Sequence, residues 1–401
     1  MLDEELPVPL NTGKRIRTMN LLSRLSRDFE IHLLVHGRRF DPAAGQECRE
    51  AGLKVIASNS EVPPKRGMAF GVRLLRNLLT SRLPYSVESH FRREFARHLR
   101  ALRRDVEFDL VHCEWTPYAS YVAGERLPVC IAAHNVEAQI WERMASECSG
   151  LKRWFLGLQA DRMRRFEETA WRRAAAVVSV SVPDAQQISQ MGARRVSVVP
   201  NGVDFEAYSG FDGERSRVVA RGATQLVFTG SMDWRPNQEG IQWFIAEVAP
   251  LLDKALEYHL TVVGRNPPRG LIAAAGECGS VSLTGTVDDV RPYIAGSDLY
   301  VVPLRSGGGS RLKILEAAAM ARPILSTSVG AEGLELEAGR HLRLADSARE
   351  FAKAIRELSA SSREASMLAR SGAQRVRELY DWGSIAPRQA DVWGGLVQGE
   401  S

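Results

Sequence analysis

The residues from Gly307 to Gly333, GGGSRLKILEAAAMARPILSTSVGAEG, have the types and spacing of an anion-binding site. Three consecutive glycines precede a helical pattern. Glycine lets backbone N–H groups approach a ligand closely, and the helix dipole adds partial positive charge at the same place. Arg311 and Lys313 fall in the expected first turn, where cations oppose the dipole and do little for helix stability. The pattern therefore predicts a phosphate site.

Glu316 lies one turn further along this expected helix, on a face that is otherwise apolar. A carboxylate there could accept hydrogen bonds from the ribose hydroxyls of a nucleotide whose phosphates lie at the glycine turn. The alternative is a solvated loop followed by a surface glutamate. Three glycines followed by a basic turn favour the binding site.

Three further motifs could take part in the same chemistry. The turn Asn11–Arg15 (NTGKR) opens the first expected helix with a glycine and cations, His134 follows an apolar strand in AAHNVE, and the segment 230–235 (GSMDWR) follows another strand. A single histidine after a strand is more often structural than catalytic. Glu114 and Glu137 could orient an acceptor hydroxyl, although a cap or a surface turn explains either glutamate equally well.

The elements that must position these residues alternate between short apolar strands and amphipathic helices, which predicts an α/β fold with parallel sheets. Strands are expected at 31–35, 53–56, 110–112, 129–133, 177–180 and 196–199, and again at 226–229, 259–263, 281–283, 299–302 and 324–326. The motifs lie at the carboxyl ends of strands, where open α/β sheets bind ligands. We expect an N-terminal domain over 1–200, a C-terminal domain over 201–380, and a helix in 381–401 that packs back toward the N-terminal domain.

The N-terminal half lacks an obvious first strand, because the first helix is expected near Lys14. Either Met1–Glu4 form a short version of that strand, or the recorded start lies downstream of the true one. A missing central strand would lower stability unless these residues replace it.

The composition is that of a globular protein, with 44% hydrophobic and 25% charged residues among 401. There is no apolar run long enough for a membrane span and no signal-peptide pattern, so we expect a cytoplasmic protein. The five cysteines include no CxxC pair, which argues against a disulfide framework and a zinc site.

The segment 64–104 contains eleven Lys or Arg and only two Glu, so it favours an anionic partner. Within it, FGVRLLRNLL alternates leucines and arginines at helical spacing, as a helix at an anionic lipid surface does. An ordinary surface helix whose arginine stems cover apolar neighbours is the alternative. No nucleic-acid-binding motif accompanies the segment, so we expect no nucleic-acid partner.

The order of these motifs resembles that of the retaining glycosyltransferases of family 4, which have the two-domain GT-B fold. The resemblance covers nearly the whole chain, and includes the first glycine turn, the histidine after a strand, VVPNGVD, LVFTGS, LTGTVDDVRPYIAGSDLYVVPL, LKILEAAAM and RPILSTSVGAEGL. It implies two Rossmann-like domains facing each other across a cleft. The nucleotide sugar would bind mainly to the C-terminal domain and the acceptor to the N-terminal domain.

By this resemblance, Glu316 matches the second, ribose-binding glutamate of the family's E-x7-E motif, and the first would fall at Gly308. Recognition of the donor sugar would then rest partly on backbone N–H groups of 309–312. The expected catalytic residues are His134, Arg235 and Lys313, with Arg265 as a rival of Arg235. Further donor-binding residues are expected at Gly13, Gly230, Arg265, Val287, Gly308, Gly309, Ser310, Arg311, Leu312 and Glu316, and acceptor-binding residues at Lys14, Glu114 and Glu137.

The resemblance further implies transfer from a UDP- or GDP-sugar to a glycan or lipid-linked acceptor, in cell-envelope or exopolysaccharide synthesis. We expect no metal and no cofactor, because fixed cations and helix N-termini can stabilise the leaving diphosphate. Asp233, Asp288 and Asp289 read as cap or turn residues. An epimerase or phosphorylase-like enzyme of the same fold, or a non-catalytic nucleotide-sugar-binding subunit, are the alternatives.

Overall fold

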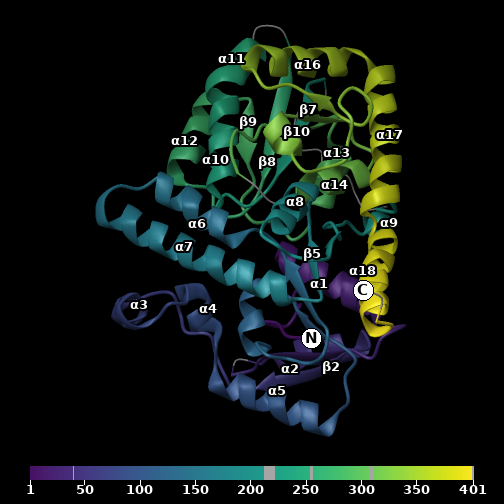
Figure 1. Cartoon of the computed structure of the whole chain (residues 1–401). Coiled ribbons are helices and arrows are strands. Elements are labelled where there is room, and N and C mark those ends of the chain that lie inside the picture. Colours follow the sequence, from purple (N-terminus) through teal and green to yellow (C-terminus); the bar gives the residue numbers. More distant parts are fainter. Residues whose placement is uncertain (39, 212–221, 253–255, 308–310, 400–401) are drawn as a thin grey trace. The chain divides into compact units, whose positions relative to one another are not determined.

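The computed structural model describes the chain except for residues 39, 212–221, 253–255, 308–310 and 400–401. It divides into two compact units, one formed by 1–200 with 385–401 and the other by 201–384. Both are α/β units with parallel sheets, as predicted (Figure 1). Among the described residues, no helix combines the length and the apolarity that a membrane span requires.

The N-terminal unit is built on parallel strands that Leu2 connects. Strands β1 (His32–His36) and β2 (Lys54–Ser58) pair with each other, and β3 (Val111–Cys113), β4 (Val129–Ala133), β5 (Ala176–Ser179) and β6 (Val196–Val198) form a second group. Leu2 makes parallel bridges to Leu34 of β1 and to Cys113 of β3. Its N–H donates to the carbonyl of His112, at 2.8 Å, and its carbonyl accepts from Glu114. The first residues thus occupy the place of the expected central strand.

Helices connect these strands. They are α1 (Gly13–Leu25), α2 (Pro42–Glu50), α3 (Met68–Thr80), α4 (Tyr85–His90), α5 (Arg93–Asp105), the 3-10 helix η1 (Thr116–Tyr121), α6 (Glu137–Ser146), α7 (Gly150–Arg173) and α8 (Val182–Gln190). The last helix, α18 (Trp382–Val397), brings Trp393 against this unit, where the indole packs edge-on against Phe29.

The C-terminal unit contains a six-stranded parallel sheet with the order β12-β11-β10-β7-β8-β9. Its strands are β7 (Thr224–Thr229), β8 (Tyr258–Val263), β9 (Val281–Leu283), β10 (Leu299–Val302), β11 (Ile324–Ser326) and β12 (Arg343–Leu344). Because the chain proceeds outward in one direction from β7 and in the other from β10, the topological switch point lies between these two strands. The glycine turn after β7 and the helix after β10 therefore begin side by side.

Helices cover both faces of this sheet, with α10 and α12 on one side and α14 on the other (Figure 1). They are α9 (Phe205–Ser209), α10 (Arg235–Trp243), α11 (Ala249–Leu252), α12 (Arg269–Cys278), α13 (Arg291–Gly296), α14 (Leu312–Ala319), α15 (Ser328–Ala331), α16 (Ala348–Ala360) and α17 (Ser362–Tyr380). A π-helical turn at Phe244–Val248 lies between α10 and α11. Aromatic and aliphatic side chains of both the strands and the helices form the core of this unit.

Candidate functional site

The glycine turn after β7 allows two backbone segments to touch at the ends of β7 and β8, beside the switch point. The N–H of Gly230 donates to the carbonyl of Val263 at 2.9 Å. A Cβ atom on Gly264 would lie only 1.9 Å from the carbonyl oxygen of Gly230, so a side chain at position 264 would displace this turn. The two glycines thus hold the ends of β7 and β8 together at the edge of the sheet where ligands bind.

Lys313, in the first turn of α14, extends its ammonium group to this glycine turn. Its Nζ atom donates to Oδ1 of Asn237 at 2.8 Å and lies 4.0 Å from the centroid of the Phe228 ring. A Cβ atom on Gly230 would come within 2.8 Å of the same Nζ. Burial lowers the pKa of Lys313 to about 7, although the Glu316 carboxylate opposes this effect. An anion bound at the turn would stabilise the positive charge of this ammonium group, which burial separates from water.

Glu316 lies half-buried one turn further along α14. Its Oε1 atom accepts a hydrogen bond from the Tyr208 hydroxyl at 3.0 Å. Burial raises the pKa of Glu316, partly offset by this hydrogen bond and by the charge of Lys313. Tyr208 comes from α9 and is not among the site residues predicted from the sequence. Its position four residues after Asp204 of the PNGVD motif is the only signal that could have found it.

Arg311 does not lie in the first turn of α14, so that expectation is wrong. It is the N-cap residue, with a left-handed backbone (φ 47°), and the helix begins at Leu312. Its buried guanidinium donates to the carbonyl of Gly307 at 2.7 Å and forms an ion pair with Glu332 at 3.5 Å. Arg311 is therefore engaged within the protein by Gly307 and Glu332. The predicted Gly308, Gly309 and Ser310 lie outside the described residues.

The two arginines proposed for the diphosphate have different surroundings. The Arg235 side chain is exposed and its Nε atom pairs with Glu239, one turn along α10, at 2.6 Å. The Nε atom of Arg265 donates to Ser231 and to Asp233, at 3.2 Å each, so Arg265 is tied to the glycine turn itself. The predicted Val287 is half-buried against the core of the unit.

Asp233 and Asp289 bond to nearby turn and helix-start residues, as expected. Asp233 accepts hydrogen bonds from Asn266 and Arg265, and Asp289 accepts from the backbone N–H of Arg291 at 2.9 Å. Across the described part of the chain, no three His, Cys, Asp or Glu side chains converge as metal ligands.

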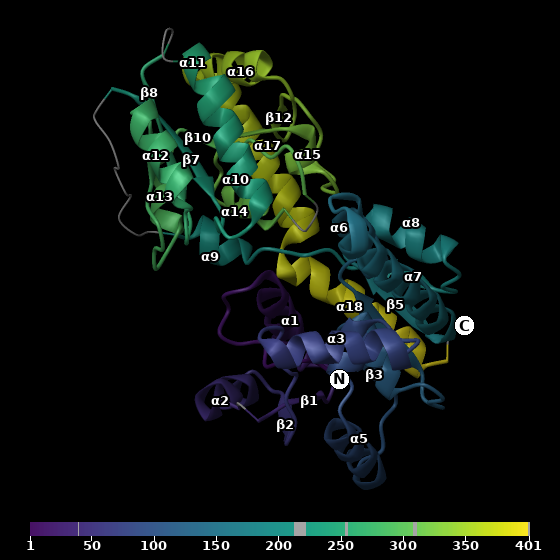
Figure 2. The same ribbon diagram turned by 90° about the vertical axis from the view of Figure 1, so that its left-hand side faces the viewer.

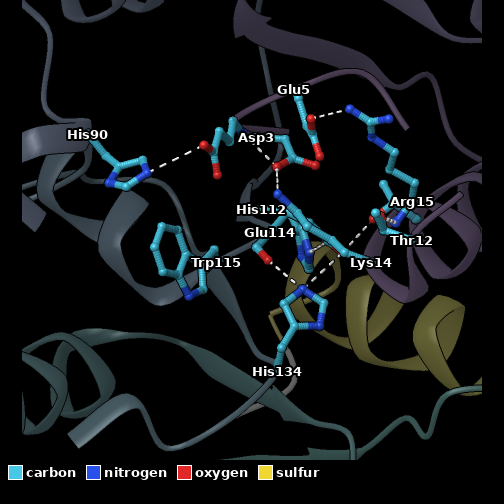
Figure 3. Close-up of polar contacts among 12 residues, drawn as sticks. Asp3, Glu5, Thr12, Lys14, Arg15, His90, His112, Glu114, Trp115 and His134 are labelled. Carbon is cyan, nitrogen blue, oxygen red and sulfur yellow. Dashed lines mark hydrogen bonds and ion pairs between the residues drawn. The ribbon is translucent and has the colours of Figure 1, made fainter. Parts of the chain in front are cut away.

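His134 and Glu114 form a dyad at the carboxyl ends of β3 and β4 (Figure 3). Nε2 of His134 lies 2.8 Å from the carbonyl oxygen of Glu114 and 3.3 Å from its Oε1 atom. Oε1 also accepts from the Thr18 hydroxyl at 2.9 Å, and Oε2 lies 3.1 Å from Nε2 of His112. The carboxylate of Glu114 is thus buried beneath His134 and is engaged on both oxygens.

The hydrogen bonds around this dyad favour the ionised form of Glu114. Burial opposes ionisation of Glu114, but the hydrogen bonds from His112 and His134 outweigh it and hold the pKa of Glu114 well below its usual range. The indole of Trp393 donates to Nδ1 of His112 at 3.2 Å, so Nε2 carries the proton of His112. His134 likewise directs Nε2 toward Glu114, which leaves Nδ1 as its nitrogen for contact with a substrate.

Gly13 begins α1, and Lys14, in the first turn of this helix, extends toward Asp3 near the N-terminus. The Nζ atom of Lys14 forms an ion pair with Asp3, which raises the pKa of Lys14 despite its burial (Figure 3). The hydroxyl of Thr12 caps the helix by accepting from the N–H of Arg15 at 3.3 Å. The structure therefore gives Lys14 a carboxylate partner within its own unit, close to Glu114.

Glu137 begins α6 and accepts from the indole of Trp115 at 3.0 Å. The backbone N–H groups of Glu137 and Ala138 donate to the carboxylate of Glu167, at 2.7 and 3.1 Å. Burial raises the pKa of Glu167 to about 8, even though both hydrogen bonds favour its ionised form. Glu167 thus caps the helix that follows His134 and holds the loop in place.

Two family profiles match this chain. Residues 13–207 match Glycosyltransferase Family 4, and residues 223–361 match Glycosyl transferases group 1. A 44.6-kDa protein in the cps region of Klebsiella pneumoniae is 22% identical over 399 residues, covering 95% of this chain and 96% of that protein.

Solved structures with the same architecture include sucrose-phosphate synthase from Thermosynechococcus elongatus, with a TM-score of 0.68, 15% identity, and coverage of 100% of this chain and 98% of that one. Anabaena HepE in complex with UDP and glucose has a TM-score of 0.67, 14% identity, and coverage of 98% of both chains. These likenesses establish the fold, and the two profiles establish the family. The chain belongs to the family 4, group 1 glycosyltransferases and has their GT-B fold.

Proposed function

We propose that this glycosyltransferase is retaining and metal-independent, and that it transfers a sugar from a nucleoside-diphosphate donor to a glycan or lipid-linked acceptor. The observation that carries the proposal is the convergence of the Gly230 turn, the buried ammonium of Lys313 and the carboxylate of Glu316 at the switch point of one sheet. A diphosphate at the turn meets a cation and backbone N–H groups, and a ribose one helical turn away meets the carboxylate.

The reaction would break the bond between the sugar C1 and the β-phosphate oxygen, and form a bond between C1 and the acceptor oxygen on the same face. The acceptor proton would pass to an oxygen of the leaving diphosphate, so no protein nucleophile is required. Lys313 would stabilise the charge that develops on the β-phosphate, and Arg265 or Arg235 would assist. His134, oriented by Glu114, would contact the donor sugar through Nδ1.

The donor is proposed to be a UDP-sugar, because the similar Anabaena HepE was solved in complex with UDP and with UDP-glucose. The relative from a cps region supports a role in capsular or other cell-envelope polysaccharide synthesis. A lipid-linked acceptor would place the reaction at the inner face of the cytoplasmic membrane. The protein is therefore proposed to be cytoplasmic and to bind that membrane peripherally.

Thermal-shift measurements with UDP, GDP and ADP test the donor site, because a ligand that binds only the native state raises its apparent stability. A panel of UDP- and GDP-sugars, with and without acceptors, then tests turnover by release of the nucleoside diphosphate. Release that persists in EDTA supports the metal-independent route, whereas release that requires added Mg²⁺ contradicts it. Nucleotide binding without release for any donor and acceptor pair would contradict the transferase proposal.

A further inference from the structure

Helix α3 leaves much of its apolar surface uncovered. Its one fully buried residue is Asn77, whereas Met68, Val72, Leu75 and Leu79 are 91%, 67%, 57% and 73% exposed. These four residues follow the helical spacing i, i+4, i+7 and i+11, and so form one continuous apolar stripe. Figure 1 shows α3 projecting from one side of the N-terminal unit, and Figure 2 views that side face-on.

A polar network fixes the inner face of α3 to α7 and α4. Asn77 accepts from Gln159 at 3.1 Å and from Arg162 at 3.2 Å, and it donates to Glu88 at 2.5 Å. Arg162 also donates to the carbonyls of Asn77 and Leu78, at 3.2 Å each. Buried polar groups with several partners specify one orientation. The helix therefore cannot turn its stripe inward without breaking these bonds, and the stripe is held outward by the fold.

Basic residues flank the stripe at both ends. Lys65 and Arg66 precede α3 and Arg82 follows it, and all three are exposed. The two arginines inside the helix have partners of their own. Arg73 donates to the Tyr85 hydroxyl at 3.2 Å, and Arg76 pairs with Glu88 at 3.4 Å. The stripe itself thus carries no charge, while its ends are positively charged.

We propose that α3 is a membrane-binding helix, with the stripe Met68, Val72, Leu75 and Leu79 inserted among lipid chains and Lys65, Arg66 and Arg82 at anionic head groups. An apolar stripe with cationic ends is complementary to an anionic bilayer surface, where apolar burial and head-group attraction act together. The inference deepens the peripheral binding proposed above, and it replaces the broad basic segment 64–104 with one defined surface. Helix α5, which carries the arginines of residues 93–104, lies elsewhere in the unit (Figures 1 and 2).

Co-sedimentation of the whole protein with vesicles, in the absence of any substrate, tests this surface. The wild-type protein should bind vesicles rich in phosphatidylglycerol and bind phosphatidylcholine vesicles more weakly. The double variant Leu75→Asp, Leu79→Asp should bind phosphatidylglycerol vesicles at least about tenfold more weakly. Removal of a single leucine side chain from water already strengthens binding by about that factor. Lys65→Glu, Arg66→Glu and Arg82→Glu together should abolish the preference for phosphatidylglycerol.

The matched control is Ile272→Asp with Met367→Asp, which changes two apolar residues of the C-terminal unit that are 50% and 62% exposed. It should bind vesicles as the wild type does.

Failure of the wild type to bind phosphatidylglycerol vesicles, or equal binding by the Leu75 and Leu79 double variant, would overturn the proposal. So would a wild-type dimer that this double variant converts to a monomer, because a second copy would then cover the stripe. Nucleotide release with a water-soluble acceptor should be unchanged in the double variant. Failure of the membrane-binding proposal can therefore be distinguished from failure of the transferase proposal.

Discussion

The hydroxyl of Tyr208 donates a hydrogen bond to Oε1 of Glu316 at 3.0 Å, and so joins a residue just after the PNGVD motif to the carboxylate of α14. Both side chains belong to the C-terminal unit. The hydrogen bond favours the ionised form of a carboxylate that burial disfavours. No described residue is hydrogen-bonded to Oε2 of Glu316, and the proposed donor site gives Tyr208 a role that can be measured.

Glu316→Ala should weaken UDP binding by roughly 1.5 to 3 kcal/mol, because the proposed hydrogen bond between a ribose hydroxyl and this carboxylate would be lost. Tyr208→Phe should weaken it less, by roughly 0.5 to 1.5 kcal/mol, because the carboxylate remains but loses its donor. Calorimetric titration with UDP measures both variants.

The 2′,3′-dideoxy analogue of UDP supplies the control for this pair of variants. The wild-type protein should prefer UDP over the analogue, and Glu316→Ala should bind the two nearly equally. A preference that survives in Glu316→Ala would show that Glu316 does not contact the ribose.

His134→Ala should lower turnover more than it lowers donor affinity, since His134 is expected to act on the sugar and not on the nucleotide. Glu114→Gln should act in the same direction but more weakly, because it removes the carboxylate charge beside Nε2 and keeps the contact of Nε2 with the backbone carbonyl. Steady-state kinetics together with UDP-sugar binding separates the two quantities. His98→Ala, at an exposed position on α5, is the matched control and should leave both unchanged. A change confined to affinity would contradict this role of His134.

The affinity for UDP should fall as the pH rises above 7, because burial lowers the pKa of Lys313 to about 7 in the free protein. A bound diphosphate favours the protonated amine and raises its pKa, so binding takes up a proton. Between about pH 7.5 and 9.5 the loss should approach about tenfold per pH unit. Lys313→Arg stays charged over this range and should flatten the dependence, whereas Lys313→Met should bind weakly at every pH. A wild-type affinity that is constant across the range would contradict this prediction.

The strands, most helices and the glycine turns could be predicted from the sequence, because period and turn residues act locally. The contacts that define the sites join distant residues, and a single sequence carries no signal for them. Lys14 is paired with Asp3, Glu114 lies between two histidines, and Asn77 is bound by Gln159. Arg311 shows that a local prediction can also be wrong. The sequence predicts it in the first turn of α14, but it is the N-cap residue of that helix and has a left-handed backbone.

Glu167 predicts a pH-dependent stability of the N-terminal unit. Burial raises its pKa to about 8, whereas a glutamate in the unfolded chain has a pKa of about 4.3. The folded protein therefore retains a proton that the unfolded chain has released, so stability should decrease as the pH rises from about 4.5 to 8. Glu167→Gln should lose this part of the decrease, and the difference in Tm from the wild type across that range measures it. Glu168→Gln, at the adjacent and more exposed position, should follow the wild type; an identical slope in Glu167→Gln would refute the assignment.

Gly264→Ala should disrupt the Gly230 turn, because the Cβ atom of the alanine would lie 1.9 Å from the carbonyl oxygen of Gly230. The ends of β7 and β8 must then separate, which displaces the Gly230 turn from the ammonium of Lys313. We expect a loss of stability of about 1 to 3 kcal/mol, typical of overpacking, together with weaker UDP binding.

Gly276→Ala is the matched control, since a Cβ atom at that helical position meets nothing within 4 Å. It should bind UDP normally and be as stable as the wild type or slightly more so. Normal UDP affinity in a folded Gly264→Ala protein would show that the donor does not depend on the contact between these two glycines.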